Sequence, residues 1–232
     1  MQQQTKISSG LQMAALAHDL RTPMCVAAGA AQMALEAGGQ DVSAQLRQIL
    51  QAVGAMDRMI SMMSEAQDMV STPAFTGEML QRELLVLTAD RAREKGQKLS
   101  VDLSALDGFM LEADYAALCR LLINLLCNAI KYTQPGGEIT LRAQMAGMRR
   151  RAGRVRFIVA DNGTGMEREF MKRMFLPFAR AWGTEAIEGC GLGLSIVREM
   201  AQRLGGRIRV RSIWGKGTTF AVSVPMQMRK ED

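Results

Sequence analysis

Apolar side chains recur at alternating intervals of four and three residues through the first 70 residues. The first stretch uses mostly small side chains and the second uses larger ones, with Gln67 at its one polar position. This spacing is typical of a heptad seam along a helix, and the segment Gly38–Asp41 can end one helix and start the next. The pattern therefore predicts a helical hairpin. The seam positions are Met13, Ala17, Leu20, Met24, Ala27, Ala31 and Ala34, then Val42, Leu46, Ile49, Val53, Met56, Ile60, Met63 and Val70.

Two helices alone bury little apolar surface. A seam on each helix therefore predicts that two hairpins pair into a dimeric four-helix bundle. The alternative is that the seams pack on the rest of the same chain.

The pattern changes after the break at Ser71-Thr72-Pro73, which we take as a linker. Helices then alternate with short strands joined by tight turns, which predicts an α+β fold: an α/β sandwich with a mixed sheet and helices on one face. The expected domains are 1–72 and 73–232. The expected helices are Glu78–Glu94, Asp114–Thr133, Glu167–Met174 and one ending at Leu204, and the expected strands are Lys98–Leu103, Gly108–Glu112, Glu138–Met145, Arg154–Ala160, Arg207–Ser212 and Thr218–Val224.

Composition narrows the class of protein. Hydrophobic residues make up 48% and charged residues 22% of the 232 residues, as in ordinary globular proteins. No run of 18 apolar residues and no signal-peptide core occurs, so we expect a soluble, cytoplasmic chain with no membrane segment. Four cysteines without a C-x-x-C pair, and a single histidine, make a zinc site improbable.

The net charge is +6, and arginines cluster at two places. One cluster is Arg149–Arg151 with Arg154 and Arg156, and the other is Arg207, Arg209 and Arg211. Such clusters suit nucleic acid or an acidic protein, or they form the solvated face of a β-hairpin. Aromatic residues, at 5%, are too scarce for base stacking, so we expect no nucleic-acid partner.

The single histidine, His18, stands beside the seam residue Ala17 and is followed by Asp19. A carboxylate there can hold one ring nitrogen and make the other a better nucleophile. Pro23 inside the predicted helix costs about 3 kcal/mol. A cost of that size beside a candidate nucleophile indicates function.

The helix 114–133 carries an unusual polar face. Asn124, Asn128, Lys131 and Tyr132 recur at helical spacing on an otherwise apolar helix. Amide oxygens can bind Mg²⁺, lysine can bind phosphate and the ring can pack on a base. The alternative is a solvated outer face.

Two glycine-bearing loops follow. In Asp161–Met166 a strand ends in an acidic residue and two glycines, and Gly189–Ser195 opens a helix whose N-terminus can hold phosphate oxygens. Neither loop has the ending of a P-loop, and the second lacks the preceding strand of a dinucleotide-binding fold.

Together these motifs resemble the catalytic core of bacterial sensor histidine kinases, over nearly the whole chain. The order of the motifs and their spacing carry the resemblance. Asp19, Met24 and Cys190 depart from the residues usual in that family without removing a functional group. The motifs are His18–Pro23, Asn124–Thr133, Asp161–Gly165, Phe175–Phe178, Gly189–Gly193 and Gly215–Phe220.

The resemblance implies a dimeric hairpin bundle followed by a Bergerat-type ATP-binding domain, and a role for each matching residue. His18 would take the γ-phosphoryl group of Mg-ATP and pass it to an aspartate of a response regulator, with Asp19 accepting its proton. Asn128 would bind Mg²⁺ near Asn124, Lys131 would touch phosphate, and Tyr132 would lie against the nucleotide. Asp161, supported by Thr218, would accept from the adenine amine. The remaining nucleotide-binding residues would be Gly163, Gly165, Arg180, Gly189, Gly191, Leu192 and Gly193.

The resemblance also suggests a reverse reaction. Asp19 and Thr22 match the family's phosphatase motif, in which the hydroxyl positions a water against the regulator's phosphoaspartate. Thr22 could instead only satisfy the backbone near Pro23. Two other functions stay open at this stage: a non-catalytic scaffold of the same fold, and a different ATPase built on the same nucleotide-binding fold.

Overall fold

The computed structural model describes residues 74–149, 152–177, 179 and 192–231, together with the helical positions 27, 29–31, 33, 34, 36, 45, 46, 49, 52, 53 and 56. The chain divides into two compact units, Met1–Ser71 and Thr72–Asp232.

In the first unit, the described positions of the predicted seam are not fully buried. Ile49, Val53 and Met56 are half-buried, and Leu46 is 50% exposed. By contrast Ala30 and Ala52, which lie off the seam, are buried. A single chain therefore leaves its seam partly open to solvent. Ala27, Ala31 and Ala34 of the first stretch are likewise half-buried. The remaining seam positions and Gly38–Asp41 lie outside the described residues.

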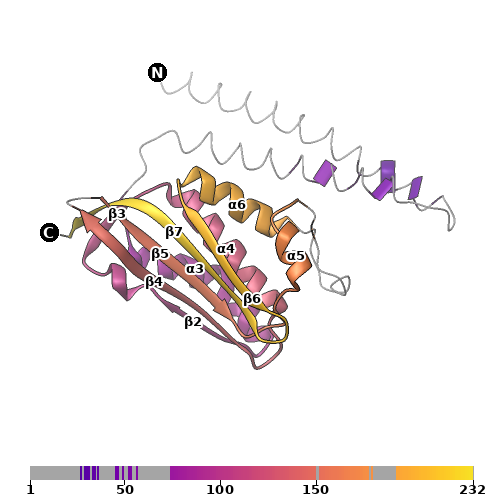
Figure 1. Cartoon of the computed structure of the whole chain (residues 1–232), viewed down its shortest axis with the longest axis horizontal. Coiled ribbons are helices and arrows are strands. Elements are labelled where there is room, and N and C mark those ends of the chain that lie inside the picture. The colour runs from indigo at the N-terminus through magenta and orange to yellow at the C-terminus, as the bar shows by residue number, and fades with distance from the viewer. Residues whose placement is uncertain are drawn as a thin grey trace, which may run out of the picture. The chain divides into compact units, whose positions relative to one another are not determined.

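The second unit is built on one sheet of seven strands, with the order β1-β3-β7-β5-β4-β2 and β6 paired to β7 (Figure 1). The pair β2·β4 is parallel and the other pairs are antiparallel, which confirms the predicted mixed sheet. The strands are β1 Phe75–Thr76, β2 Lys98–Asp102, β3 Phe109–Glu112, β4 Glu138–Arg149, β5 Ala152–Asp161, β6 Arg207–Ile213 and β7 Gly217–Lys230.

Helices cover one face of this sheet (Figure 1). Their buried leucines, such as Leu84 and Leu122, meet the inward residues of β5 and β7, such as Phe157 and Val222, in one core. Each large apolar side chain buried there contributes about 1.5–3 kcal/mol. The helices are α3 Gly77–Glu94, α4 Tyr115–Tyr132, α5 Arg168–Arg173 and α6 Gly193–Arg203, with a 3-10 turn η1 at Ser104–Leu106.

The predicted elements of this unit are present, with shifted ends. Helix α3 starts at Gly77, before the expected Glu78, because the Thr76 hydroxyl accepts from the backbone N–H of Met79 at 3.1 Å and caps it. Strand β1 and the turn η1 were not predicted, because elements of two or three residues carry no readable period.

Strand β7 is the largest departure from the prediction. It continues past Val224 through Pro225 to Lys230. A proline lacks the N–H that a central strand donates. Pro225 is tolerated because β6 pairs with β7 only as far as Ser223 and β3 begins to pair at Gln227, so one edge of β7 is free between them.

Candidate nucleotide site

Helix α4 supplies the predicted polar face. Asp114 caps it by accepting from the backbone N–H of Ala117 at 3.0 Å. Its leucines are buried, whereas Asn124, Asn128, Lys131 and Tyr132 are half-exposed along one side. The ammonium of Lys131 lies 5.2 Å from the centre of the Tyr132 ring.

Asn128 faces the start of α6. A Cβ atom on Gly193 would lie 3.2 Å from Oδ1 and 3.3 Å from Nδ2 of Asn128, and 3.5 Å from Oδ1 of Asn124. Nδ2 of Asn128 is buried and has no hydrogen-bond partner in the described part of the chain. Leaving a buried NH₂ donor unpaired costs about 1–3 kcal/mol, so Nδ2 is suited to an acceptor such as a phosphate oxygen. The amide oxygen of the same side chain is the atom that could bind Mg²⁺. An amide beside a helix N-terminus fits the predicted Mg²⁺ and phosphate site.

The start of α6 is suited to anions. Its first residues follow Leu192, which makes no side-chain cap, and its first turn contains no acidic residue. The Ser195 hydroxyl is occupied, because it donates to the carbonyl of Leu192 at 2.8 Å. The first backbone N–H groups of a helix without a cap can serve phosphate oxygens.

Asp161, the last residue of β5, forms the second part of the site. The backbone N–H groups of Gly163 and Thr218 both donate to Oδ1, at 2.9 and 3.2 Å. Burial raises the pKa of Asp161 above the ordinary carboxyl value, and these two hydrogen bonds oppose part of that shift. Both bonds go to Oδ1, and within the described residues no donor reaches the other carboxylate oxygen, which could therefore accept from a ligand.

Glycines allow the backbone to close around Asp161. Gly217 has φ +101°, and a Cβ atom there would lie 2.0 Å from the Asp161 carbonyl oxygen. Gly165 has φ +66°, and its Cβ would lie 2.1 Å from the carbonyl oxygen of Ile213. Gly163 approaches Tyr132, whose carbonyl oxygen would be 2.4 Å from a Cβ. Any side chain at these positions would push the Asp161 loop away from α4 and β7.

Ser212 is a supporting residue that the sequence did not reveal. Its hydroxyl lies 2.9 Å from the hydroxyl of the buried Thr218 and accepts from the backbone N–H of Met166 at 2.8 Å. Ser212 thereby ties the loop after Asp161 to β7. The pairing of Ser212 with Thr218 is set by the register of β6 on β7, which no local pattern encodes.

The end of α4 is held by two further residues that the sequence did not reveal. The Lys95 ammonium donates to the carbonyls of Ile130, Lys131 and Thr133, at 2.7, 3.0 and 3.4 Å. The Gln97 amide donates to the carbonyls of Ile130 and Thr133. A cation at the negative end of the helix dipole is favourable. These bonds fix the turn that carries Lys131 and Tyr132, and the Tyr132 carbonyl in turn accepts from Thr164 in the loop after Asp161.

Lys95→Met should therefore disturb the site from a distance. We expect a thermal midpoint lowered by about 2–4 °C for each kcal/mol lost, and a raised KM for ATP with kcat changed less. Calorimetry and ATP titrations measure both. Lys98→Met is the matched control, because the ion pair of Lys98 with Glu138 is exposed and contributes little. Equal behaviour of the two variants would contradict a positioning role for Lys95.

Several predicted site residues lie outside the described residues: His18, Asp19, Thr22, Arg180, Gly189 and Gly191. The structure brings together Asn124, Asn128 and Gly193 at one part of α4, and Tyr132, Gly163, Gly165, Asp161 and Thr218 at its end. Lys131 lies on the same side of α4, and Leu192 directly precedes α6.

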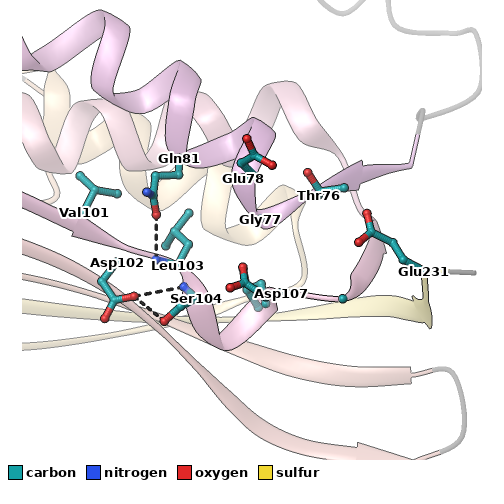
Figure 2. A pocket seen from close by; sticks show the side chains of 12 residues that line it. Thr76, Gly77, Glu78, Gln81, Val101, Asp102, Leu103, Ser104, Asp107 and Glu231 are labelled. Carbon is teal, nitrogen blue, oxygen red and sulfur yellow. Dashed lines mark hydrogen bonds between the residues drawn. The ribbon is translucent and has the colours of Figure 1, made fainter.

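A cavity of about 540 Å³ opens elsewhere in this unit, between the start of α3, the end of β2 and η1 (Figure 2). None of the predicted nucleotide-binding residues lines it, whereas Glu78, Asp102, Asp107 and Glu231 do. The Ser104 hydroxyl and backbone N–H hold the pKa of Asp102 below its ordinary value, so this carboxylate stays charged. Four carboxylates repel a triphosphate, so this cavity is not suited to ATP.

Among the described residues, none of the helices is both long and apolar enough to cross a membrane.

Two family models match the chain. Residues 113–228 match the family of histidine kinase-, DNA gyrase B- and HSP90-like ATPases. Residues 8–69 match the His kinase A phospho-acceptor domain. The two matches follow each other in the order that the sequence motifs indicate.

Curated relatives align with most of the chain. The adaptive-response sensory kinase SasA of Synechococcus elongatus is 31% identical over 231 residues, covering 92% of this chain and 58% of that protein. The sensor histidine kinase AruS of Pseudomonas aeruginosa is 30% identical over 227 residues, covering 93% of this chain and 22% of that protein. The chain thus spans less than two thirds of the length of both relatives.

Solved structures share the fold. The catalytic domain of histidine kinase ThkA is 28% identical with a TM-score of 0.53, covering 66% of this chain and 94% of that one. Full-length ShkA in complex with AMPPNP is 27% identical with a TM-score of 0.62, covering 95% of this chain and 46% of that one.

Proposed function

Because the chain belongs to the sensor histidine kinases, we propose that it is an ATP-dependent protein histidine kinase of a two-component system. It transfers the γ-phosphoryl group of ATP to His18 and then supplies that group to an aspartate of a response regulator. As the catalytic core of such a system, it acts in the cytoplasm, where ATP is available.

The arrangement at Asp161 carries the proposal. One carboxylate oxygen is held by Gly163 and Thr218, and the other is free to accept from the exocyclic amine of adenine. Guanine carries a carbonyl oxygen at that position and would meet a carboxylate with no donor between them. The site therefore favours ATP over GTP. Tyr132, on the neighbouring turn of α4, packs against the base.

The phosphates extend from the base toward α6. Lys131 neutralises part of their charge, and the backbone at Leu192 and Gly193 donates to their oxygens. Gly189, Gly191 and Arg180 complete this part of the site. Asn128, with Asn124 nearby, would hold Mg²⁺ through its amide oxygen, and a bound Mg²⁺ would supply positive charge beside the phosphate oxygens.

In the transfer step, a ring nitrogen of His18 forms a bond to the γ-phosphorus as the bond to the β–γ bridging oxygen breaks, and ADP leaves. Asp19 accepts the proton that the imidazole loses. Transfers of this kind depend on positioning and charge neutralisation more than on covalent help from the protein.

Incubation with γ-labelled ATP tests the proposal. We expect label on the protein that is lost in acid and kept in base, which is characteristic of a phosphohistidine, and none from α-labelled ATP. A non-catalytic scaffold would take up no label. An ATPase of another class would release labelled phosphate without labelling His18. Either result would overturn the proposal.

We also propose that the chain acts as a homodimer through its first unit. Leu46, Ile49, Val53 and Met56 line a seam that a single chain leaves partly exposed.

Changing Ile49, Val53 and Met56 together to Asp should give a monomer, because the interface would then bury unpaired charges. Light scattering of the full chain measures the mass. Met33→Asp, at a 57% exposed position off the seam, should remain dimeric. A dimeric triple variant would disprove the bundle.

Thr22 is proposed to act in the reverse reaction by positioning a water against the regulator's phosphoaspartate. Thr22→Ala should then slow dephosphorylation of the regulator while His18 labelling stays nearly unchanged. If Thr22 only supports the helix near Pro23, both activities and the thermal midpoint should fall together.

A further inference from the structure

The sheet face opposite the helices carries a set of arginines that the proposed kinase activity does not use. Alternate residues of β5 and β7, including Val155 and Phe157, are buried toward the helices, so their neighbours point to the other face. No described helix or strand covers that face in Figure 1. We call five residues on it the arginine face: Arg154, Arg156, Arg207, Arg209 and Arg211.

These arginines form two rows. In β6, Arg207, Arg209 and Arg211 are exposed at alternate positions. In β5, Arg154 is exposed and Arg156 is half-exposed. Since strands lie about 4.8 Å apart, the two rows stand roughly 10 Å apart with β7 between them.

The outward side chains of β7 between the two rows are small, and some of them are apolar. Ser223 of β7 pairs with Arg207 on one side and Arg156 on the other. Ala221, the next outward residue of β7, pairs with Arg209 and with Ile158. The result is a strip of small side chains on β7, with Arg207, Arg209 and Arg211 along one side and Arg154, Arg156 and Ile158 along the other. We call this strip the trough.

The residues that the structure describes do not neutralise the trough. In the described part of the chain none of the five arginines forms an ion pair, and the one hydrogen bond among them runs from Arg156 to the Ser223 hydroxyl at 3.4 Å. Arg207, Arg209 and Arg211 follow one another at alternate residues of β6, about 6.7 Å apart along the strand, so their charges repel one another. Binding of carboxylates would relieve this repulsion.

We propose that the arginine face binds an acidic amphipathic helix of a partner protein. An α-helix is about 10–12 Å across, which fits the roughly 10 Å between the rows. Carboxylates four residues apart on a helix are about 6 Å apart, close to the roughly 6.7 Å between alternate residues of β6. Ala221 and Ile158 would meet the apolar stripe of that helix. Ile213 and Trp214, 61% and 55% exposed at the end of the β6 row, offer an apolar anchor.

Two other occupants are less favoured. Single-stranded nucleic acid needs several aromatic side chains for stacking, and Trp214 is the one exposed aromatic residue near this face among those that the structure describes. A membrane surface needs large apolar side chains across the face, whereas Ala221 and Ser223 are small and Ile158, in the β5 row, is half-buried.

A labelled helical peptide of about 18 residues, or roughly 27 Å of helix, tests the proposal by fluorescence anisotropy with the full chain. It carries leucines along one stripe and glutamates at four-residue intervals on both sides. Arg207→Glu with Arg209→Glu should weaken binding by about tenfold or more. The control pair Arg82→Glu with Arg168→Glu, exposed and away from the trough, should change it less than twofold. A second peptide carries glutamine in place of every glutamate. Its affinity for the parent chain should be no higher than the affinity of the double variant for the glutamate peptide.

The double variant should keep His18 labelling, which shows that it is folded. Arg209→Gln, a milder change, should weaken binding in the same direction. Peptide binding that is equal for the parent and the double variant would overturn the proposal. So would tighter binding of single-stranded oligonucleotides or of phosphatidylserine vesicles that depends on the same arginines.

Discussion

Asp161→Asn is expected to abolish useful ATP binding and at the same time to stabilise the protein. Asparagine can keep both backbone bonds, from Gly163 and Thr218, on its side-chain oxygen. The other carboxylate oxygen is then replaced by an NH₂ group. This group and the adenine amine are both hydrogen-bond donors, so no hydrogen bond can form between them. We expect the Kd for ATP to rise by about 100-fold, as for other sites in which a buried polar group is left unpaired.

The gain in stability follows from the pKa of Asp161. Because burial raises the pKa of this carboxyl in the folded state, the charged form destabilises the fold at neutral pH. The native state therefore binds its proton more readily than the unfolded chain does, and the contribution of Asp161 falls as pH rises through the raised pKa. Asparagine removes that cost, so the thermal midpoint should rise by about 2–4 °C for each kcal/mol gained.

Calorimetry with and without ATP measures both effects in one experiment. The advantage of Asp161→Asn over the parent should be largest at neutral pH and shrink as the pH falls below the raised pKa. Asp107→Asn, at an exposed carboxylate, should leave both quantities unchanged. A variant that loses stability, or that binds ATP like the parent, would contradict the assignment of Asp161 to the adenine.

Asn128→Ala should lower His18 phosphorylation by about 100-fold or more without unfolding the protein. Removing a group that holds charge in place at a phosphoryl-transfer site has effects of this size. Nδ2 of Asn128 has no partner in the described part of the chain, so alanine there breaks no hydrogen bond of that group and improves helix propensity. The thermal midpoint without nucleotide should stay level or rise.

Labelling from γ-labelled ATP at saturating Mg²⁺ measures the loss, and calorimetry measures the stability. Asn124→Ala is the comparison on the same helix face, where the lost amide does donate to the Arg120 carbonyl at 2.7 Å. It should cost some stability and less activity. Unchanged labelling of Asn128→Ala would exclude a role in metal binding.

The sequence predicted the fold of the second unit well where an element had both a period and a cap. Helix α4 shows this best, since Asp114 marks its start and its apolar residues repeat over 18 positions. The extension of β7 past Pro225 was missed because it depends on which neighbours pair at that point. The local sequence pattern cannot show where along β7 the pairing with β6 ends and the pairing with β3 begins.

The same distinction applies to the site. Asp161, Asn128 and the glycines could be selected as candidates, because their motifs are contiguous in the chain, and their roles remain a proposal. Lys95 and Ser212 could not, because the contacts that tie them to the site join residues far apart in the chain, 35 apart for Lys95 and Ile130 and 46 apart for Ser212 and Met166. Asp161 was expected to accept from a base. That its Oδ1 takes both internal bonds is visible only once β5 and β7 lie side by side.

Because α4 is one continuous helix, it fixes the spacing between the side chains that it carries. Asn128 and Tyr132 are one turn apart on the same helix, so the distance between the proposed metal site and the proposed base site is set by a whole number of residues, about 1.5 Å each. An inserted residue between them would rotate Tyr132 by roughly 100° and turn it away from the Asp161 loop. Conservative substitutions between Asn128 and Tyr132 should therefore preserve ATP binding, whereas an insertion or deletion there should abolish it.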